Sequence, residues 1–199
     1  MTREKVLNMV KELEDKDIKY INKQWFYQAS KYNYEKYKSI LSDGILCNYL
    51  LMNKSYKYNG PYYISIIRDL GSEFKYSSYL QYLESVPMLI LNENIDALPT
   101  LKETILGKLL INTKSTHRIS EFDDEYQVPF KIETKDIIGI EFYFEKILKN
   151  SMQNDKVITP FFELKSLVNL MNELNIDLPI FDYSTYKEIN KDKVLKLQI

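Results

Sequence analysis

The sequence feature that most constrains the fold is an alternating run at positions 125–132, which an acidic stretch precedes. If this run is a strand, Tyr126, Val128 and Phe130 lie on one face and Glu125 begins the other. A carboxylate at the start of a strand, with an amide two positions later, can face a cleft and hold a cation-like centre. The competing interpretation is an acidic loop that leads into an ordinary strand, because charge runs are usually solvated.

Composition excludes several classes of protein. The 199 residues, of which 45% are hydrophobic and 28% charged, predict one globular domain with or without a small appendage. A net charge of −1 provides no overall basic field for nucleic acid. Cys47 is the single cysteine and His117 the single histidine, so we expect neither a disulfide framework nor a cysteine-based or paired-histidine metal site. No apolar run has the length of a membrane span and no signal-peptide core follows Met1. These features predict a cytoplasmic protein with no membrane partner, and delivery by a dedicated secretion system stays open as an alternative.

Helical patterns alternate with extended runs along the chain. The spacing of apolar residues predicts helices at 3–20 and 159–175, and a short helix that Asn33 caps and Gly44 ends. The residues of the short helix that we expect to face inward are Tyr34, Tyr37, Ile40 and Leu41. Further strands are predicted at 24–30, 62–67, 87–91 and 137–144.

These patterns predict an α+β domain at positions 1–150, followed by a C-terminal helical appendage at 151–199 that packs on it. The boundary is placed near residue 150, where the character of the sequence changes ahead of an amphipathic helix that a threonine and a proline start at 159–160. The five glycines of the chain are isolated, so the sequence gives no support to a Rossmann or P-loop nucleotide site.

Three stretches occur in an order that resembles the ADP-ribosyltransferase fold. The resemblance is to bacterial ADP-ribosylating toxins that modify DNA and to the related RNA 2′-phosphotransferases, and it covers positions 24–145. The stretches are FYQAS at 26–30 with ILSDGIL at 40–46, NGPYYIS at 59–65, and DEYQV at 124–128 with IIGI at 137–140. The resemblance implies an ADP-ribosyltransferase-like arrangement of split antiparallel sheets with peripheral helices.

The resemblance also implies a reaction and its residues. The substrate would be NAD, and Glu125 would be the catalytic glutamate that stabilises an oxocarbenium-like ribose. Tyr63 and Ser65 would shape the nicotinamide pocket. Arg68 could supply a phosphate contact, although a surface arginine at a strand end is the commoner case. The family carries a His or Arg on its first strand where this chain has Gln28, an amide that can bind a hydroxyl but brings no charge.

Several alternatives stay open at this point. One is a catalytically inactive domain of the same fold that binds a protein partner through the 159–175 helix. For an active toxin or effector, the acceptor of ADP-ribose would be an unknown protein or nucleic acid. A nuclease-like protein is disfavoured by the balanced charge. His117 and Arg118 could reach a substrate from a loop, although a solvated loop histidine is the commoner case.

Overall fold

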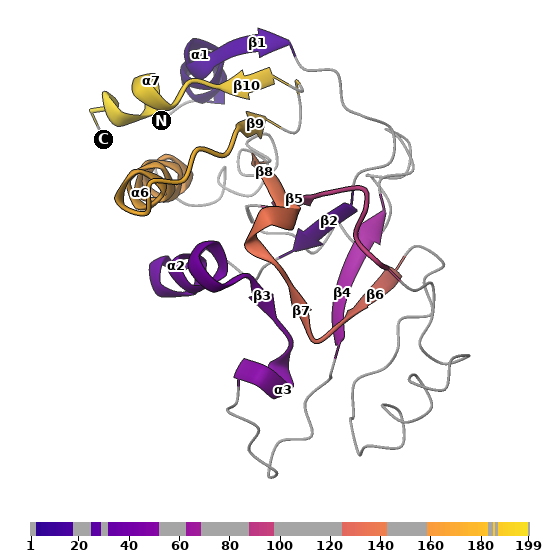
Figure 1. Cartoon of the computed structure of the whole chain (residues 1–199). Helices are drawn as coiled ribbons and strands as arrows, with labels where there is room; N and C mark the ends of the chain where they lie inside the picture. The colour runs from indigo at the N-terminus through magenta and orange to yellow at the C-terminus, as the bar shows by residue number, and fades with distance from the viewer. Residues whose placement is uncertain are drawn as a thin grey trace.

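The computed structural model describes residues 3–17, 25–28, 32–51, 63–68, 88–97, 125–142, 159–182, 185 and 187–198. These residues form a mixed α+β structure with an eight-stranded sheet, a two-stranded sheet and a layer of helices (Figure 1). No helix among the described residues is long and apolar enough to cross a lipid bilayer.

The large sheet is mixed, and its strands follow the order β1-β10-β9-β8-β5-β2-β4-β6. Every neighbouring pair is antiparallel except β8 and β9. Its strands are β1 (Glu14–Asp17), β2 (Trp25–Gln28), β4 (Tyr63–Arg68), β5 (Met88–Leu91), β6 (Glu125–Pro129), β8 (Ile137–Phe142), β9 (Ile180–Asp182) and β10 (Lys187–Ile189). The α+β class and the strands predicted near 24–30, 62–67, 87–91 and 137–144 are therefore confirmed.

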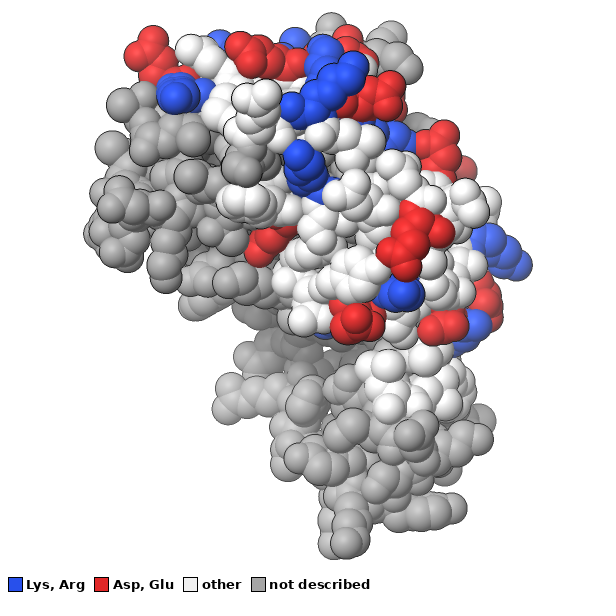
Figure 2. All heavy atoms as spheres, turned by 90° about the vertical axis from the view of Figure 1, so that its left-hand side faces the viewer, with Lys and Arg blue, Asp and Glu red and all other residues white. Residues whose placement is uncertain are grey.

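Helices cover one face of this sheet (Figure 1). They are α1 (Arg3–Leu13), α2 (Tyr34–Asp43), α3 (Asn48–Leu51), α6 (Thr159–Glu173) and α7 (Lys191–Leu195), with a 3-10 turn, η4 (Thr134–Asp136). Viewed from the helix side, the described Lys, Arg, Asp and Glu side chains are interspersed rather than gathered by sign (Figure 2). This face therefore offers no field of one charge to a partner.

The C-terminal part is more than a helical appendage. Its strands β9 and β10 extend the large sheet, with β9 parallel to β8 and β10 paired to β1. The helix predicted at 3–20 ends at Leu13, and the chain continues as β1. Strands of three or four residues are too short for alternation to show in a sequence, and all four residues of β1 are charged.

Paired charges explain how so polar a segment can form the edge strand β1. Glu14 accepts a hydrogen bond from the Thr185 hydroxyl at 2.5 Å and lies 3.6 Å from Lys187 Nζ. Asp15 forms an ion pair with Lys193 at 3.0 Å. Glu14 and Asp15 thus have partners from β10, α7 and the connection that precedes β10. Charged residues also protect a sheet edge from pairing with other chains.

The helix α2 forms as its sequence predicts. Asn33 Oδ1 accepts a hydrogen bond from Lys36 N at 3.0 Å, and Gly44 ends the helix with φ +89°. The expected inward residues Tyr37, Ile40 and Leu41 are buried. Tyr34 is partly buried and packs against the same core, while its hydroxyl donates a hydrogen bond to Glu173 at the surface of α6.

The cap of α2 gives a test of local stability. Replacing Asn33 with alanine removes the acceptor for Lys36 N–H and should lower the free energy of unfolding by about 1 kcal/mol. Urea denaturation followed by circular dichroism measures this difference. Asn33→Asp keeps an acceptor at the same position and should restore most of the loss. Equal stability of the alanine variant and the wild type would contradict the assigned cap.

The helix α6 belongs to the hydrophobic core. Its buried apolar residues are Phe161, Leu164, Leu167, Val168, Leu170 and Met171. They pack in one cluster with residues of the sheet and of α2, so the apolar stripe of the 159–175 helix is used within the chain. Phe162, which is 51% exposed, is the large hydrophobic residue that the described part of α6 presents to solvent.

A polar contact ties α6 to α2 at the surface. Glu173 accepts hydrogen bonds from the Tyr34 hydroxyl and from Lys38 Nζ, the latter at 3.0 Å. The bond from Tyr34 is the larger cause, and the bond from Lys38 the smaller, of a lowered pKa for the Glu173 carboxyl. A carboxyl with a lowered pKa stabilises the fold above its unfolded value of 4.5, and this contribution is lost as pH falls through the lowered value.

This contact predicts a pH-dependent difference. Glu173→Gln should unfold more easily than the wild type at pH 7, and the two should converge as pH falls below the unfolded value of 4.5. Denaturant titrations between pH 3 and pH 7, at steps of about one pH unit, give the free energies of unfolding that measure the effect. Glu12→Gln, on the exposed side of α1, is the control for the loss of a surface carboxylate. A gap for Glu173→Gln that stays constant with pH would refute the assignment.

The alternating run at 125–132 is divided into two strands. The strand β6 pairs with β4, and then β7 (Lys131–Ile132) pairs with β3 (Ile45–Leu46) in the small sheet. Phe130 makes the bend between them with φ +61°, and its carbonyl accepts a hydrogen bond from Cys47 N at 2.9 Å. Val128 is buried, but Phe130, which the alternation predicted on the same face, is 41% exposed because the left-handed bend interrupts the alternation.

Candidate functional site

The five predicted site residues lie on three neighbouring strands of the large sheet. Gln28 is the last residue of β2, Glu125 is the first of β6, and β4 between them carries Tyr63, Ser65 and Arg68. These strands come from distant parts of the sequence. The fold therefore brings together the three segments on which the family resemblance depended.

Strand register decides which of these positions share a face. Phe26 pairs with Ile67, and Ile67 pairs with Glu125, so these three residues occupy one row across the sheet. Ser65 pairs with Gln127 in a second row on the same face. Because side chains alternate along each strand, residues two positions apart also share this face. This face also carries the apolar positions Phe26, Ile67 and Pro129. Its polar positions, which we call the polar face, are Gln28, Tyr63, Ser65, Glu125 and Gln127.

The opposite face of the same strands is the core face. Ile64, Ile66 and Val128 are buried there and belong to the hydrophobic cluster that the helices cover. Arg68 pairs with Trp25, and alternation along β4 places it on this core face. The register therefore brings Gln28, Tyr63, Ser65 and Glu125 together and separates Arg68 from them.

The residues of the polar face offer hydrogen-bonding groups and one negative charge. A carboxylate, a hydroxyl, a phenol and two amides can bind the hydroxyl groups and the amide of a ligand. None of these five positions carries a positive charge. The described residues include no group of three or more His, Cys, Asp or Glu side chains that could hold a metal ion.

A tyrosine cluster supports β2 from the core face. Tyr37 of α2 is fully buried, and its ring centroid lies 5.0 Å from that of Tyr32. The Tyr32 hydroxyl lies 2.9 Å from Ser166 Oγ of α6. Burial raises the pKa of Tyr27 and of Tyr37 above the usual value of 10.0. The phenol groups of Tyr27 and Tyr37 therefore remain neutral at physiological pH.

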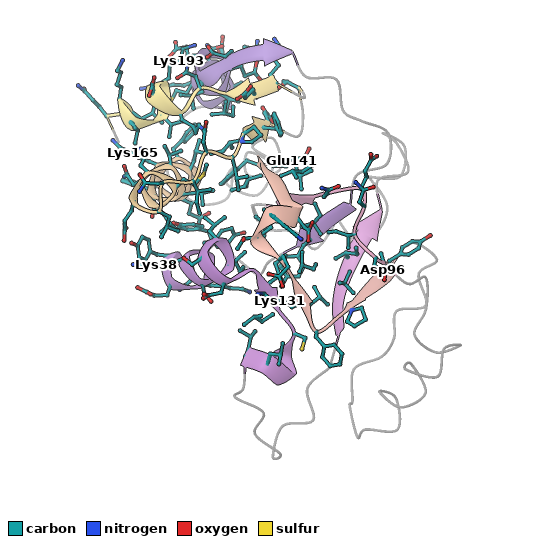
Figure 3. All side chains as sticks on the ribbon, in the orientation of Figure 1. Lys38, Asp96, Lys131, Glu141, Lys165 and Lys193 are labelled. Carbon is teal, nitrogen blue, oxygen red and sulfur yellow. The ribbon has the colours of Figure 1, made fainter. Side chains whose placement is uncertain are left out.

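A further acidic residue lies on the polar face and is missing from the sequence-based site. Glu141 of β8 is 1% exposed (Figure 3). It pairs with Met88, and Met88 pairs with Gln28, so Glu141 continues the same face two strands beyond β2. The signal in the sequence is a single acid within the apolar run at 137–144. A buried charge is rare unless it is paired or used.

Two other candidates of the sequence give little support to a catalytic site. Cys47 is 2% exposed, as expected of a structural thiol. His117 and Arg118 lie outside the described residues. Comparison of the chain with protein-family models, with curated proteins and with solved structures gives no match.

Proposed function

We propose that this chain is an NAD-dependent ADP-ribosyltransferase or NAD glycohydrolase whose catalytic residue is Glu125. The observation that supports this best is the common face of Glu125, Ser65 and Tyr63 on adjacent strands, with Gln28 on the next strand. The ADP-ribosyltransferase resemblance requires these strands to be neighbours, although they are far apart in sequence. An ADP-ribosyltransferase-like sheet is accordingly the finer fold assignment that we propose.

The proposed chemistry is cleavage of the bond between nicotinamide and ribose. Nicotinamide leaves with the bonding electron pair, and positive charge develops on the ribose as an oxocarbenium-like centre. The Glu125 carboxylate would hold a ribose hydroxyl and stabilise that charge. A nucleophile of the acceptor then bonds to the anomeric carbon and loses its proton, and with water the outcome is hydrolysis.

The other residues of the polar face have supporting roles in this proposal. Tyr63 and Ser65 would form the wall of the nicotinamide pocket, where a phenol can pack on the ring and a hydroxyl can bind its amide. Gln28 would bind a ribose hydroxyl through its amide. Because Arg68 lies on the core face, we assign the NAD phosphates no cation among the described positions of this sheet face.

Titration with NAD followed by measurement of nicotinamide release tests the proposal. Saturable binding and release of nicotinamide by the purified chain, with or without an added cell extract as a source of acceptor, would support it. The proposal would be contradicted if the chain neither bound NAD nor released nicotinamide, both with and without the extract. Mass spectrometry of the extract would then identify whether a protein or a nucleic acid gained ADP-ribose.

A second candidate function is an inactive domain of the same type that binds a protein. The observation in its favour is that the polar face carries no positive charge, with Gln28 in place of a family cation and Arg68 on the other side of the sheet. Because the apolar stripe of α6 is buried, a partner on this helix would contact the side that exposes Phe162. This function would be favoured if the chain did not bind NAD but formed a stable complex with a protein partner, and if Phe162→Asp abolished that complex.

A further inference from the structure

Gln127 belongs to the polar face, and the proposed reaction has so far given it no role. It lies two positions after Glu125 on β6 and pairs with Ser65 of β4. These three positions are therefore direct neighbours on one face of the sheet, with no other position of that face between them on β6. Gln127 adjoins both the proposed catalytic carboxylate and the proposed wall of the nicotinamide pocket.

The spacing of the three positions suits the part of NAD at which the reaction occurs. Residues two positions apart on a strand are separated by about 7 Å, and the Cβ atoms of residues directly opposite each other on antiparallel strands by about 5 Å. The nicotinamide ring with its carboxamide extends over a comparable length from the ribose that carries it. If the ribose hydroxyl is bound at Glu125, the carboxamide can lie within reach of Gln127 and Ser65.

We propose that Gln127 binds the carboxamide of nicotinamide and makes the site specific for that group. This inference rests on the proposed function, because it requires the nicotinamide ribose to lie at Glu125. A glutamine amide is complementary to a carboxamide, since each has a C=O acceptor and N–H donors. Gln127 would accept a hydrogen bond from one N–H of the carboxamide and donate one to its C=O. The Ser65 hydroxyl would accept a hydrogen bond from the second N–H.

This arrangement predicts which analogue of NAD the site rejects. In the 3-acetylpyridine analogue, a methyl group replaces the amino group of the carboxamide and the C=O acceptor is kept. Bound in the same way, the analogue would leave the side-chain oxygen of Gln127 without a donor. A polar group left without its hydrogen bond in a binding site lowers affinity, so discrimination against the analogue should depend on the residue at position 127.

The test compares the dissociation constants of NAD and its 3-acetylpyridine analogue for the whole chain and its variants. The wild type should bind NAD about tenfold more tightly than the analogue, which is the scale of one hydrogen bond between neutral groups. Gln127→Met keeps the length of the side chain without its amide, so it should bind NAD more weakly and lose the preference. Asn169→Leu is the matched control, because it replaces an exposed amide of α6, a helix that packs on the core face. It should leave the preference unchanged.

A second variant tests the inference in the opposite direction and decides it if Gln127→Met does not fold. Gln127→Glu keeps an acceptor for the N–H of NAD but has no donor for a C=O. Because the analogue offers only that C=O, Gln127→Glu should raise the preference for NAD above that of the wild type.

The outcomes distinguish this inference from the proposed function. Equal affinity of the wild type for the two dinucleotides would overturn the role of Gln127 and leave the proposed function in place. A wild-type preference in both folded Gln127 variants, or an equal loss of preference in Asn169→Leu, would do the same. Failure of the wild type to bind either dinucleotide would overturn both proposals together.

Discussion

Replacing Glu125 with glutamine should reduce the rate of nicotinamide release at least about a hundredfold, the scale of losing one preorganised electrostatic contact to a transition state. Glutamine has nearly the same shape and can still bind a ribose hydroxyl, but it has no negative charge to stabilise the oxocarbenium-like centre. We therefore expect kcat to fall much more than the affinity for NAD. Release assays over a range of NAD concentrations separate the two quantities.

A matched variant distinguishes catalysis from a general loss of acidic charge. Glu133 lies just after β7, and its side chain is 51% exposed in an ion pair with Lys131 at 2.8 Å. An exposed pair of this kind contributes at most about 1 kcal/mol, so Glu133→Gln should retain the wild-type release rate. If Glu125→Gln released nicotinamide as fast as Glu133→Gln, Glu125 could not be the catalytic residue.

Replacing Gly44 with alanine should lower the free energy of unfolding by about 3 kcal/mol or more. The backbone of Gly44 has φ +89° and ψ −177°, a region that is essentially restricted to glycine. A Cβ atom at this position would also lie 2.3 Å from the backbone oxygen of Ile132. Because Ile132 is paired with Ile45, neither backbone can move without disturbing the small sheet.

Gly139 provides the comparison for this effect. A Cβ atom there would lie 3.2 Å from side-chain carbons of Ile90 and Phe181, which can shift by a few tenths of an ångström. Gly139→Ala should therefore cost about 1 kcal/mol, which is typical of mild overpacking. Denaturant titrations of both variants measure the two losses. Equal losses, or a larger loss for Gly139→Ala, would contradict the assigned conformation of Gly44.

Elements with strong local signals could be predicted from the sequence. The helix α2 is an example, since Asn33 and Gly44 provide physical reasons for both of its ends. The buried side chains of Ile64 and Ile66 lie two positions apart on β4, as the alternation of a strand requires. By contrast, β1 and β10 depend on each other for their formation. Short strands that are stabilised by a partner far away in the sequence have no local pattern to detect.

The residues of the candidate site could be named from the sequence, but their geometry could not. The resemblance implied a chemistry for Glu125, Ser65 and Gln28, and the strand order and register place these positions on one face. The assignment of Arg68 to the site depended on its position near the end of a strand, and a shift of one position reverses the face of a residue. Glu141 was overlooked because a single acid within an apolar run does not show which face of the sheet it occupies.

The pairing of β1 with β10 has a consequence for the order in which the protein folds. Glu14 has its partner in Ile189, so one edge of the sheet joins residues that are separated by most of the chain. During synthesis, the charged strand β1 must wait for β10 to emerge before it can pair, while α2 and its cap can form early from local contacts. Pairing of β1 with β10 is therefore expected to be a late step in folding. In a ribosome-bound chain that ends before β9, the N-terminal helix should not be able to form its native contacts.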